Sequence, residues 1–187
     1  MTDETVIPED AVLLLVDFQT GFDESDWGER NNPEAESVAA ALLDHWRETD
    51  RPVAHVRHAS TEPNSPLRPD APGFAWKSET APRSDEATFE KSVNGALLES
   101  GVDEWLQGEG YTTLVVCGLT TDHCVSTTVR TAENRGYEVF VVADATATHA
   151  REGYDGTEIS PETSHQVALA HLRDEFATVV NATDVIG

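Results

Sequence analysis

Two continuous apolar runs restrict what this chain can fold into. Residues 11–16 read AVLLLV and residues 114–117 read LVVC, and neither run alternates apolar with polar side chains. A strand without alternation is buried on both faces, which is typical of the centre of a parallel sheet that helices cover on both sides. The first run ends at Asp17 and the second at Gly118. The pattern therefore favours an α/β fold.

Strands and helices alternate along the rest of the chain. Strands are predicted at residues 53–56, 88–90, 138–142 and 176–180, and helices after Pro33, at 102–109, from Cys124 to about Arg135, and after Ser160. This order predicts a three-layer α/β/α fold with a mostly parallel sheet, and we expect residues 1–187 to form a single domain. Residues 23–32 and 60–87 are predicted loops. Phe74 and Trp76 in the second loop favour a binding loop or lid over disorder.

The charge balance excludes several classes of partner. The 187 residues include 35 Asp and Glu against 12 Lys and Arg, a formal net charge of −23. Such a surface repels phosphate backbones and anionic lipids, so we expect neither nucleic-acid nor membrane binding. Lys77 and Lys91 are the only lysines, and the acidic residues are spread along the chain. We interpret this as a halophilic adaptation, with an acidic surface for a cationic partner as the alternative.

The termini and cysteines suggest a cytoplasmic protein. The N-terminus, MTDETVIPED, lacks a basic region followed by an apolar one, and no apolar run approaches the ~20 residues of a membrane span. Cys117 and Cys124 are the only cysteines. We expect them to be reduced, and two cysteines alone do not form a zinc site.

Three reactive residues, Asp17, Lys91 and Cys124, each follow a predicted strand. Ligands of open parallel sheets bind at the carboxyl ends of the strands, so these side chains are expected to meet there. Thr120, Thr121 and Asp122 are suited to capping the helix that Cys124 begins, and a thiol at a helix start is expected to favour the thiolate. Lysine would stabilise that thiolate and the carboxylate would move its proton. Each residue alone has a structural reading as a cap, a surface charge or a buried thiol.

Three motifs resemble those of the isochorismatase-like cysteine hydrolases, which include nicotinamidases and N-carbamoylsarcosine amidohydrolases. They are VDFQTGF at residues 16–22, FEKSVNGAL at 89–97 and CGLTTDHCVSTT at 117–128, and they occur in the family's order. The resemblance implies a Rossmann-like fold with a six-stranded sheet and a catalytic triad of Asp17, Lys91 and Cys124. It also implies a cis peptide bond between Leu119 and Thr120, and an oxyanion hole formed by the N–H groups of Thr120 and Cys124.

The implied reaction is hydrolysis of a carbon–nitrogen bond in a small amide, carbamoyl or ureido compound through a thioester on Cys124. Isochorismatases proper cleave a vinyl ether and lack this cysteine, so vinyl-ether cleavage is an alternative. A binding protein without catalytic activity is another. A dinucleotide-binding role is disfavoured because no G-x-G-x-x-G follows the first strand.

The sequence also departs from the family pattern. Nicotinamidases hold a metal through an Asp-x-His pair and a further histidine, and here Val56 stands where the aspartate is expected. His58 alone is a poor metal site, so we expect no metal and no cofactor.

Candidate contacts with a small-molecule substrate are Gln19, Phe22, His58 and Trp76. His149 and Arg151 are further candidates to reach the pocket, whereas His123 is expected to point away from it. Family members commonly form dimers or tetramers, so the resemblance implies a homo-oligomer.

Overall fold

The computed structural model describes residues 7–187, and a six-stranded sheet forms its centre. The strand order is β3-β2-β1-β4-β5-β8, and every neighbouring pair is parallel. The strands are β1 (Val12–Val16), β2 (Val53–His58), β3 (Ala87–Lys91), β4 (Thr113–Leu119), β5 (Glu138–Ala147) and β8 (Thr178–Val180). The predicted parallel sheet is confirmed.

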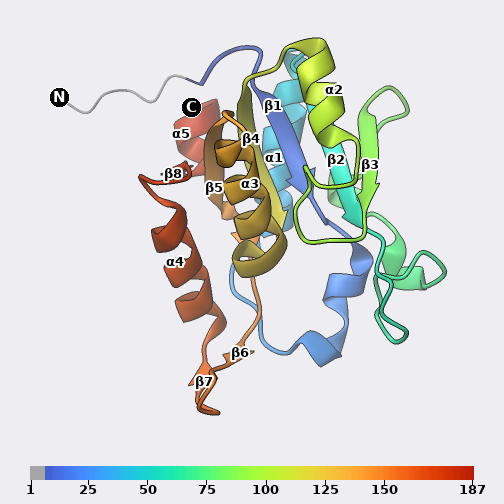
Figure 1. The fold of residues 1–187 in the computed structure, drawn as a ribbon, viewed down its shortest axis with the longest axis vertical. Helices are drawn as coiled ribbons and strands as arrows, with labels where there is room; N and C mark the ends of the chain where they lie inside the picture. Colours follow the sequence, from blue (N-terminus) through green and yellow to red (C-terminus); the bar gives the residue numbers. More distant parts are fainter. Residues whose placement is uncertain (1–6) are drawn as a thin grey trace.

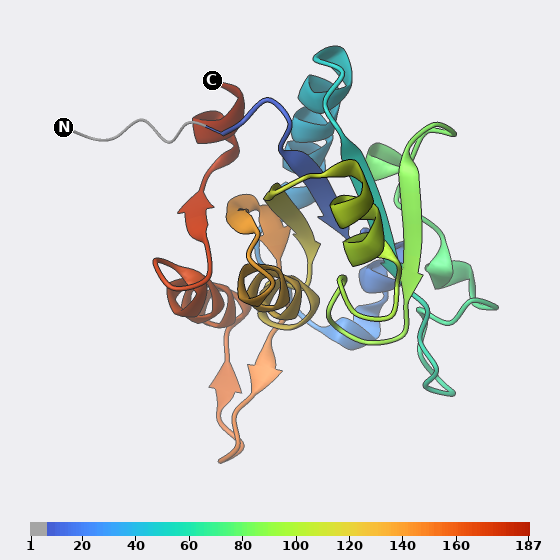
Figure 2. The same ribbon diagram turned by 45° about the horizontal axis from the view of Figure 1, so that its top comes forward.

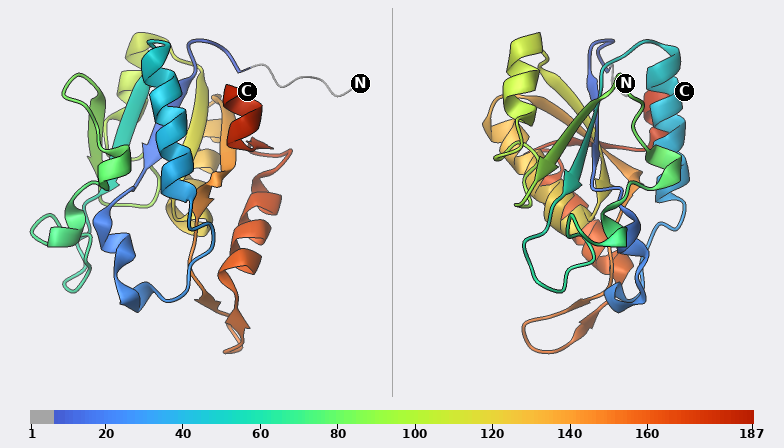
Figure 3. Two further views of the ribbon diagram at one scale, coloured as in Figure 1. Left: turned by 180° about the vertical axis from the view of Figure 1, so that it is seen from behind. Right: turned by 90° about the vertical axis from the view of Figure 1, so that its right-hand side faces the viewer.

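Helices cover both faces of this sheet, which gives the predicted three layers (Figure 1 and Figure 3). One face carries α1 (Ala35–Glu48) and α5 (Ala182–Ile186), and the other carries α2 (Val102–Glu109), α3 (Ser126–Asn134) and α4 (Pro161–Leu172). A small hairpin of β6 (Arg151–Glu152) and β7 (Glu158–Ile159) projects beyond the layers (Figure 2).

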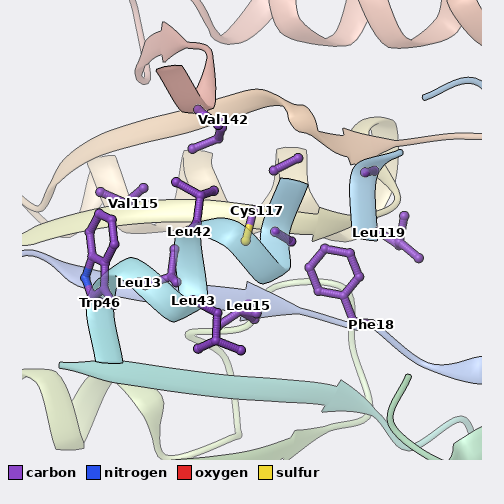
Figure 4. Packing of buried hydrophobic residues seen from close by; sticks show 14 of the residues in the cluster. Leu13, Leu15, Phe18, Leu42, Leu43, Trp46, Val115, Cys117, Leu119 and Val142 are labelled. Carbon is purple, nitrogen blue, oxygen red and sulfur yellow. The ribbon is translucent and has the colours of Figure 1, made fainter. Parts of the chain in front are cut away.

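The apolar run of β1 has no alternation because each of its faces belongs to a different core. Leu13 and Leu15 pack with the α1 side, whereas Val12, Leu14 and Val16 pack with the α2 and α3 side. Figure 4 shows Leu42, Leu43 and Trp46 of α1 on the first of these faces. The Trp46 indole also donates a hydrogen bond to the carbonyl of Ala11 at 2.9 Å.

Several elements differ from the predicted ranges at the carboxyl half of the chain. β5 continues to Ala147 rather than ending at residue 142, and α5 and the β6–β7 hairpin were not predicted. Asp144 looks like a strand breaker in the sequence, but its Oδ1 accepts a hydrogen bond from the Ala182 N–H at the start of α5. A partner from a distant segment thus satisfies the polar side chain within the strand.

The long segment between β2 and β3 is packed against the body of the protein. It contains two 3-10 turns, Pro72–Phe74 and Ser78–Thr80, and buries Leu67 and Phe74. At Gly73 a Cβ atom would lie 2.6 Å from the Gly21 Cα, so the two loops cross at a contact that only glycine permits. Lys77 is buried as well and forms ion pairs with Asp23 and Glu36.

No helix among residues 7–187 is long and apolar enough to cross a membrane.

The strand order reverses direction between β1 and β4, where open parallel sheets bind their ligands. The two strands approach closely at Gly118, where a Cβ atom would lie 2.0 Å from the Val16 carbonyl oxygen. The φ angle of Gly118 is +138°. A side chain is therefore excluded at this position for reasons of both space and backbone conformation.

A buried ion cluster joins β2, α1 and the start of β3. The ring nitrogen Nε2 of His55 donates to Glu86 at 2.9 Å, and Arg47 donates to the same carboxylate at 2.6 Å. Burial lowers the pKa of His55 to about 4, although Glu86 opposes this shift. Burial opposes the shift of Glu86, but the hydrogen bond from Arg47 lowers its pKa to about 2.

Acid should destabilise the protein through His55. In the unfolded chain His55 becomes protonated below about pH 6.5, whereas in the folded protein it stays neutral down to about pH 4. Between these two pH values the unfolded state binds more protons, so the unfolding free energy falls as the pH falls. Relative to His55→Gln, which does not titrate, the wild type should lose roughly 2 kcal/mol of unfolding free energy between pH 7.5 and pH 5. Urea unfolding of both proteins at the two pH values measures the difference. A constant difference would contradict the assignment.

Candidate active site

Asp17 ends β1 with an unusual backbone conformation. Its φ angle is +54°, in the left-handed region that aspartate tolerates better than most residues. The Asp17 N–H donates to the Val56 carbonyl at 2.8 Å, and the side chain is fully buried. Oδ1 has no hydrogen-bond partner among residues 7–187. A buried oxygen of this kind is free to accept a proton.

Lys91, the last residue of β3, lies at the centre of the site. Its ammonium nitrogen Nζ is 2.6 Å from Asp17 Oδ2, 3.2 Å from His58 Nδ1 and 3.4 Å from Cys124 Sγ. An ammonium has three N–H donors and no acceptor, so each donor has one partner here. Neutral His58 therefore accepts at Nδ1 and carries its proton on Nε2.

Cys124 lies in a π-helical turn, Thr121–Val125, that precedes α3. The predicted side-chain cap of this helix is wrong, because no side chain of Thr120, Thr121 or Asp122 caps the turn. Thr121 instead contacts His165 of α4 at 2.9 Å. The side chains that suggested a cap connect the turn to other elements. The peptide bond between Leu119 and Thr120 is cis, at the position that the family resemblance implied.

The thiol of Cys124 is protonated in the resting site. Burial raises its pKa, the charge of Asp17 raises it further, and the nearby Lys91 lowers it by less. The expectation that the helix start favours a thiolate is therefore wrong for the resting protein, because burial disfavours the charged form. Sγ is 3.7 Å from Oδ1 of Asn94, a residue that the sequence analysis missed. Its place three residues after Lys91 was the available signal.

Gln19 holds the end of β2 in place and does not line the cavity beside Cys124. Its amide accepts a hydrogen bond from the His58 N–H at 2.8 Å and donates to the His58 carbonyl at 3.1 Å. Both amide groups are thus used by the backbone, and Gln19 is fully buried. Gln19 does not line the cavity beside Cys124, so its substrate contact stays a prediction. Its position makes it a support for His58.

A cavity of about 220 Å³ lies beside Cys124, and aromatic and apolar side chains form part of its wall. Phe22, as predicted, lies on this wall beside Trp27, with ring centroids 5.1 Å apart. Buried His149 stacks behind both rings. Trp27 was missed because its segment is acidic, although a tryptophan in such a loop was a signal. His58 and Leu67 also line the cavity.

Trp76, another predicted contact, does not line this cavity. It pairs with Gln19 through an isolated antiparallel bridge, and its ring packs edge-on against His55 with centroids 6.0 Å apart. The guanidinium of Arg57 lies 5.1 Å from the Trp76 ring centroid. The aromatic residue thus anchors the long segment to β2. This packing explains why it occurs in a loop.

Polar side chains also line the rim of the cavity. Arg151 reaches it from β6 and donates to Asp122 at 2.6 Å, and Asp122 also accepts from Thr148. Although burial opposes the shift, the hydrogen bonds from Arg151 and Thr148 lower the pKa of Asp122. His123 lies on this rim with its side chain 57% exposed, so the expectation that it points away is wrong. The rim therefore offers a guanidinium and an imidazole to the cavity that Cys124 lines.

The residues do not fit the metal site of nicotinamidases. Val56 has no donor atom and is fully buried in β2. His58 directs Nδ1 toward the ammonium of Lys91. A different donor set is nevertheless present, because donor atoms of Asp17, His58 and Cys124 all lie within 4.8 Å of one another.

Comparisons with known proteins agree with this geometry. The sequence model of the isochorismatase domain family matches residues 11–184. The isochorismatase family protein YrdC of Bacillus subtilis is 38% identical over 95% of both chains. A streptothricin hydrolase of Streptomyces noursei is 31% identical, over 92% of this chain and 69% of that protein.

Solved structures show the same fold. An isochorismatase family member from Chromobacterium violaceum superimposes with a TM-score of 0.93 at 37% identity, covering 97% of this chain and 94% of that one. An isochorismatase from Pseudomonas putida superimposes with a TM-score of 0.87 at 32% identity, covering 94% and 89%. Family members are hydrolases. The chain belongs to the isochorismatase family.

Proposed function

We propose that this protein hydrolyses a carbon–nitrogen bond of a small amide, carbamoyl or ureido compound, with Cys124 as the nucleophile. One observation carries the proposal: the Lys91 ammonium lies between the Asp17 carboxylate at 2.6 Å and the Cys124 sulfur at 3.4 Å. A base and a cation beside a buried thiol are what a cysteine nucleophile needs.

The names of several relatives support this substrate class. Besides the streptothricin hydrolase, a ureidoacrylate amidohydrolase of Methylobacterium radiotolerans and a nicotinamidase of Escherichia coli match 57% and 49% of this chain. The cavity of about 220 Å³ limits the substrate to a small group near the nucleophile. Phe22 and Trp27 offer apolar contacts, and Arg151 and His123 offer polar ones.

In the proposed first half-reaction, the carboxylate of Asp17 takes the proton of Cys124 as the sulfur attacks the carbonyl carbon. The protonated resting thiol makes this transfer necessary, and the ammonium of Lys91 stabilises the sulfur charge as it forms. The N–H groups of Thr120 and Cys124 would bind the tetrahedral oxyanion. The amine or ammonia then leaves with the proton from Asp17, which gives a thioester.

In the second half-reaction a water molecule attacks the thioester carbonyl. Asp17 accepts a proton from this water and returns it to the sulfur when the carbon–sulfur bond breaks. The products are the acid and the regenerated thiol. His58 accepts from the Lys91 ammonium at Nδ1 and keeps its proton on Nε2.

A panel of small amides, carbamoyl compounds and ureido compounds tests the reaction class through ammonia release in high salt. We expect release from at least one class, with a loss of at least about a thousandfold in Cys124→Ala. Acid quenching followed by mass spectrometry should detect a thioester on Cys124 of the wild type. Cys117→Ala is the matched control and should keep activity, because the fully buried Cys117 side chain packs in the core on the α1 face of the sheet and does not line the cavity. Turnover without a thioester, or release that survives Cys124→Ala, would contradict the mechanism.

The two lysines allow a matched test of the ion pair with Asp17. Lys91→Met leaves that buried carboxylate without a countercharge, which should cost about 3–5 kcal/mol of unfolding free energy and reduce kcat at least about a hundredfold. The double variant Asp17→Asn/Lys91→Met should recover most of the stability but no activity. Lys77→Met removes the other buried lysine and should leave kcat within about threefold. Denaturant unfolding and steady-state kinetics measure both quantities. Recovery of activity in the double variant would exclude the roles given to Asp17 and Lys91.

We also propose that the acidic surface is an adaptation to salt. Both lysines are buried, so the exposed surface of residues 7–187 carries no lysine charge. The Debye length falls from about 10 Å at 0.1 M salt to about 3 Å at 1 M, which screens the repulsion between carboxylates. The urea midpoint should therefore rise as KCl increases from 0.1 to 2 M. A midpoint that stays constant or falls would exclude this interpretation.

A further inference from the structure

Three chemically different donors surround the Lys91 ammonium. A carboxylate oxygen of Asp17, a ring nitrogen of His58 and the sulfur of Cys124 come from the ends of β1 and β2 and from the turn after β4. These three atoms lie within 4.8 Å of one another. Because each of them contacts the same ammonium nitrogen, the structure already contains a cage that holds a cation.

The donor set matches the preferences of thiophilic metals. Zinc and related ions bind thiolate, imidazole and carboxylate together in tetrahedral sites with bonds of about 2.0–2.3 Å. Such a metal would draw the three donors closer than their present separation. His58 and Cys124 line the cavity, so the fourth position would face the space where substrate enters. Asp17 Oδ1, buried and without a partner among residues 7–187, is an additional oxygen available to the ion.

Charge balance makes the metal and the ammonium mutually exclusive. In the resting site the buried charges are the Asp17 carboxylate and the Lys91 ammonium, which cancel. A divalent ion that binds the Cys124 sulfur displaces its proton, and the resulting thiolate and the carboxylate together balance the metal charge. An ammonium that remained would add an uncompensated buried charge, which is costly.

We propose that Asp17, His58 and Cys124 form an inhibitory site for a thiophilic divalent cation such as Cd²⁺ or Zn²⁺, which replaces the Lys91 ammonium. The sulfur–metal bond forms, the sulfur–hydrogen bond breaks, and the Lys91 ammonium loses a proton to become a neutral amine, so that two protons pass to solvent. The metal then occupies the nucleophile and separates it from Lys91. Of these three ligands, only His58 stands at a position that binds the metal in nicotinamidases, so the proposed site is a different one.

Cadmium titration of the purified protein tests the proposal through the ultraviolet charge-transfer absorption of a cadmium–thiolate bond. We expect one Cd²⁺ per chain in the wild type and in Cys117→Ala, and no absorption at this stoichiometry in Cys124→Ser. His58→Leu should bind at least about tenfold more weakly. Mg²⁺ should not compete, because it prefers oxygen ligands.

The distinguishing variant is Lys91→Gln, with Lys91→Met as a second if the first does not fold. Removing the ammonium should strengthen Cd²⁺ binding at least about tenfold, because two cations then no longer compete for the same donors. Lys77→Met is the matched control and should bind as the wild type does. Unchanged or weaker binding in the Lys91 variants would overturn the proposal, as would absorption that persists in Cys124→Ser. Cd²⁺ binding is measured without substrate, so this test can fail or succeed independently of the test for amide hydrolysis.

Discussion

The site depends on one buried cation with three acceptors. The ammonium of Lys91 neutralises Asp17, orients the His58 ring and lies beside the Cys124 sulfur. Burying this ammonium would cost free energy if any of the three contacts were lost, because a buried charge needs both a countercharge and a full set of hydrogen bonds. The arrangement also keeps the carboxylate close to a protonated thiol. In the proposed mechanism, Cys124 therefore transfers its proton at the moment of attack rather than being ionised beforehand.

The surrounding fold serves to bring these strand ends together. Close contact between β1 and β4 at Gly118 places the turn that carries Cys124 next to Asp17. The left-handed backbone of Asp17 ends its strand. Gln19 then fixes the backbone at His58, which is aligned with Lys91 in the neighbouring strand. Supports of this kind act through backbone hydrogen bonds, which position side chains more rigidly than packing alone.

Both lysines of this acidic protein are used inside it. Lys91 forms the ion pair with Asp17, and Lys77 joins Asp23 and Glu36 at the base of the long segment. Buried ion pairs are screened by salt much less than surface ones, so the pairs of Lys91 with Asp17 and of Lys77 with Glu36 persist where exposed pairs weaken. The Lys77 contacts also attach the segment after β2 to the loop that carries Phe22 and Trp27. One lysine thus forms its ion pair inside the site, and the other forms its ion pairs between the loops outside it.

The sequence by itself determined the layers, the parallel sheet and the strand ends that carry Asp17, Lys91 and Cys124. It could do so because burial on both faces requires uninterrupted apolar runs, and polar residues after those runs mark the ends. Only the tertiary structure decided how side chains outside this periodicity are directed. Gln19 and Trp76 turn to the backbone and to His55, whereas the missed Trp27 and Asn94 face the cavity. These directions depend on contacts between loops that are distant in sequence, and such contacts cannot be predicted from the local pattern of polar and apolar residues.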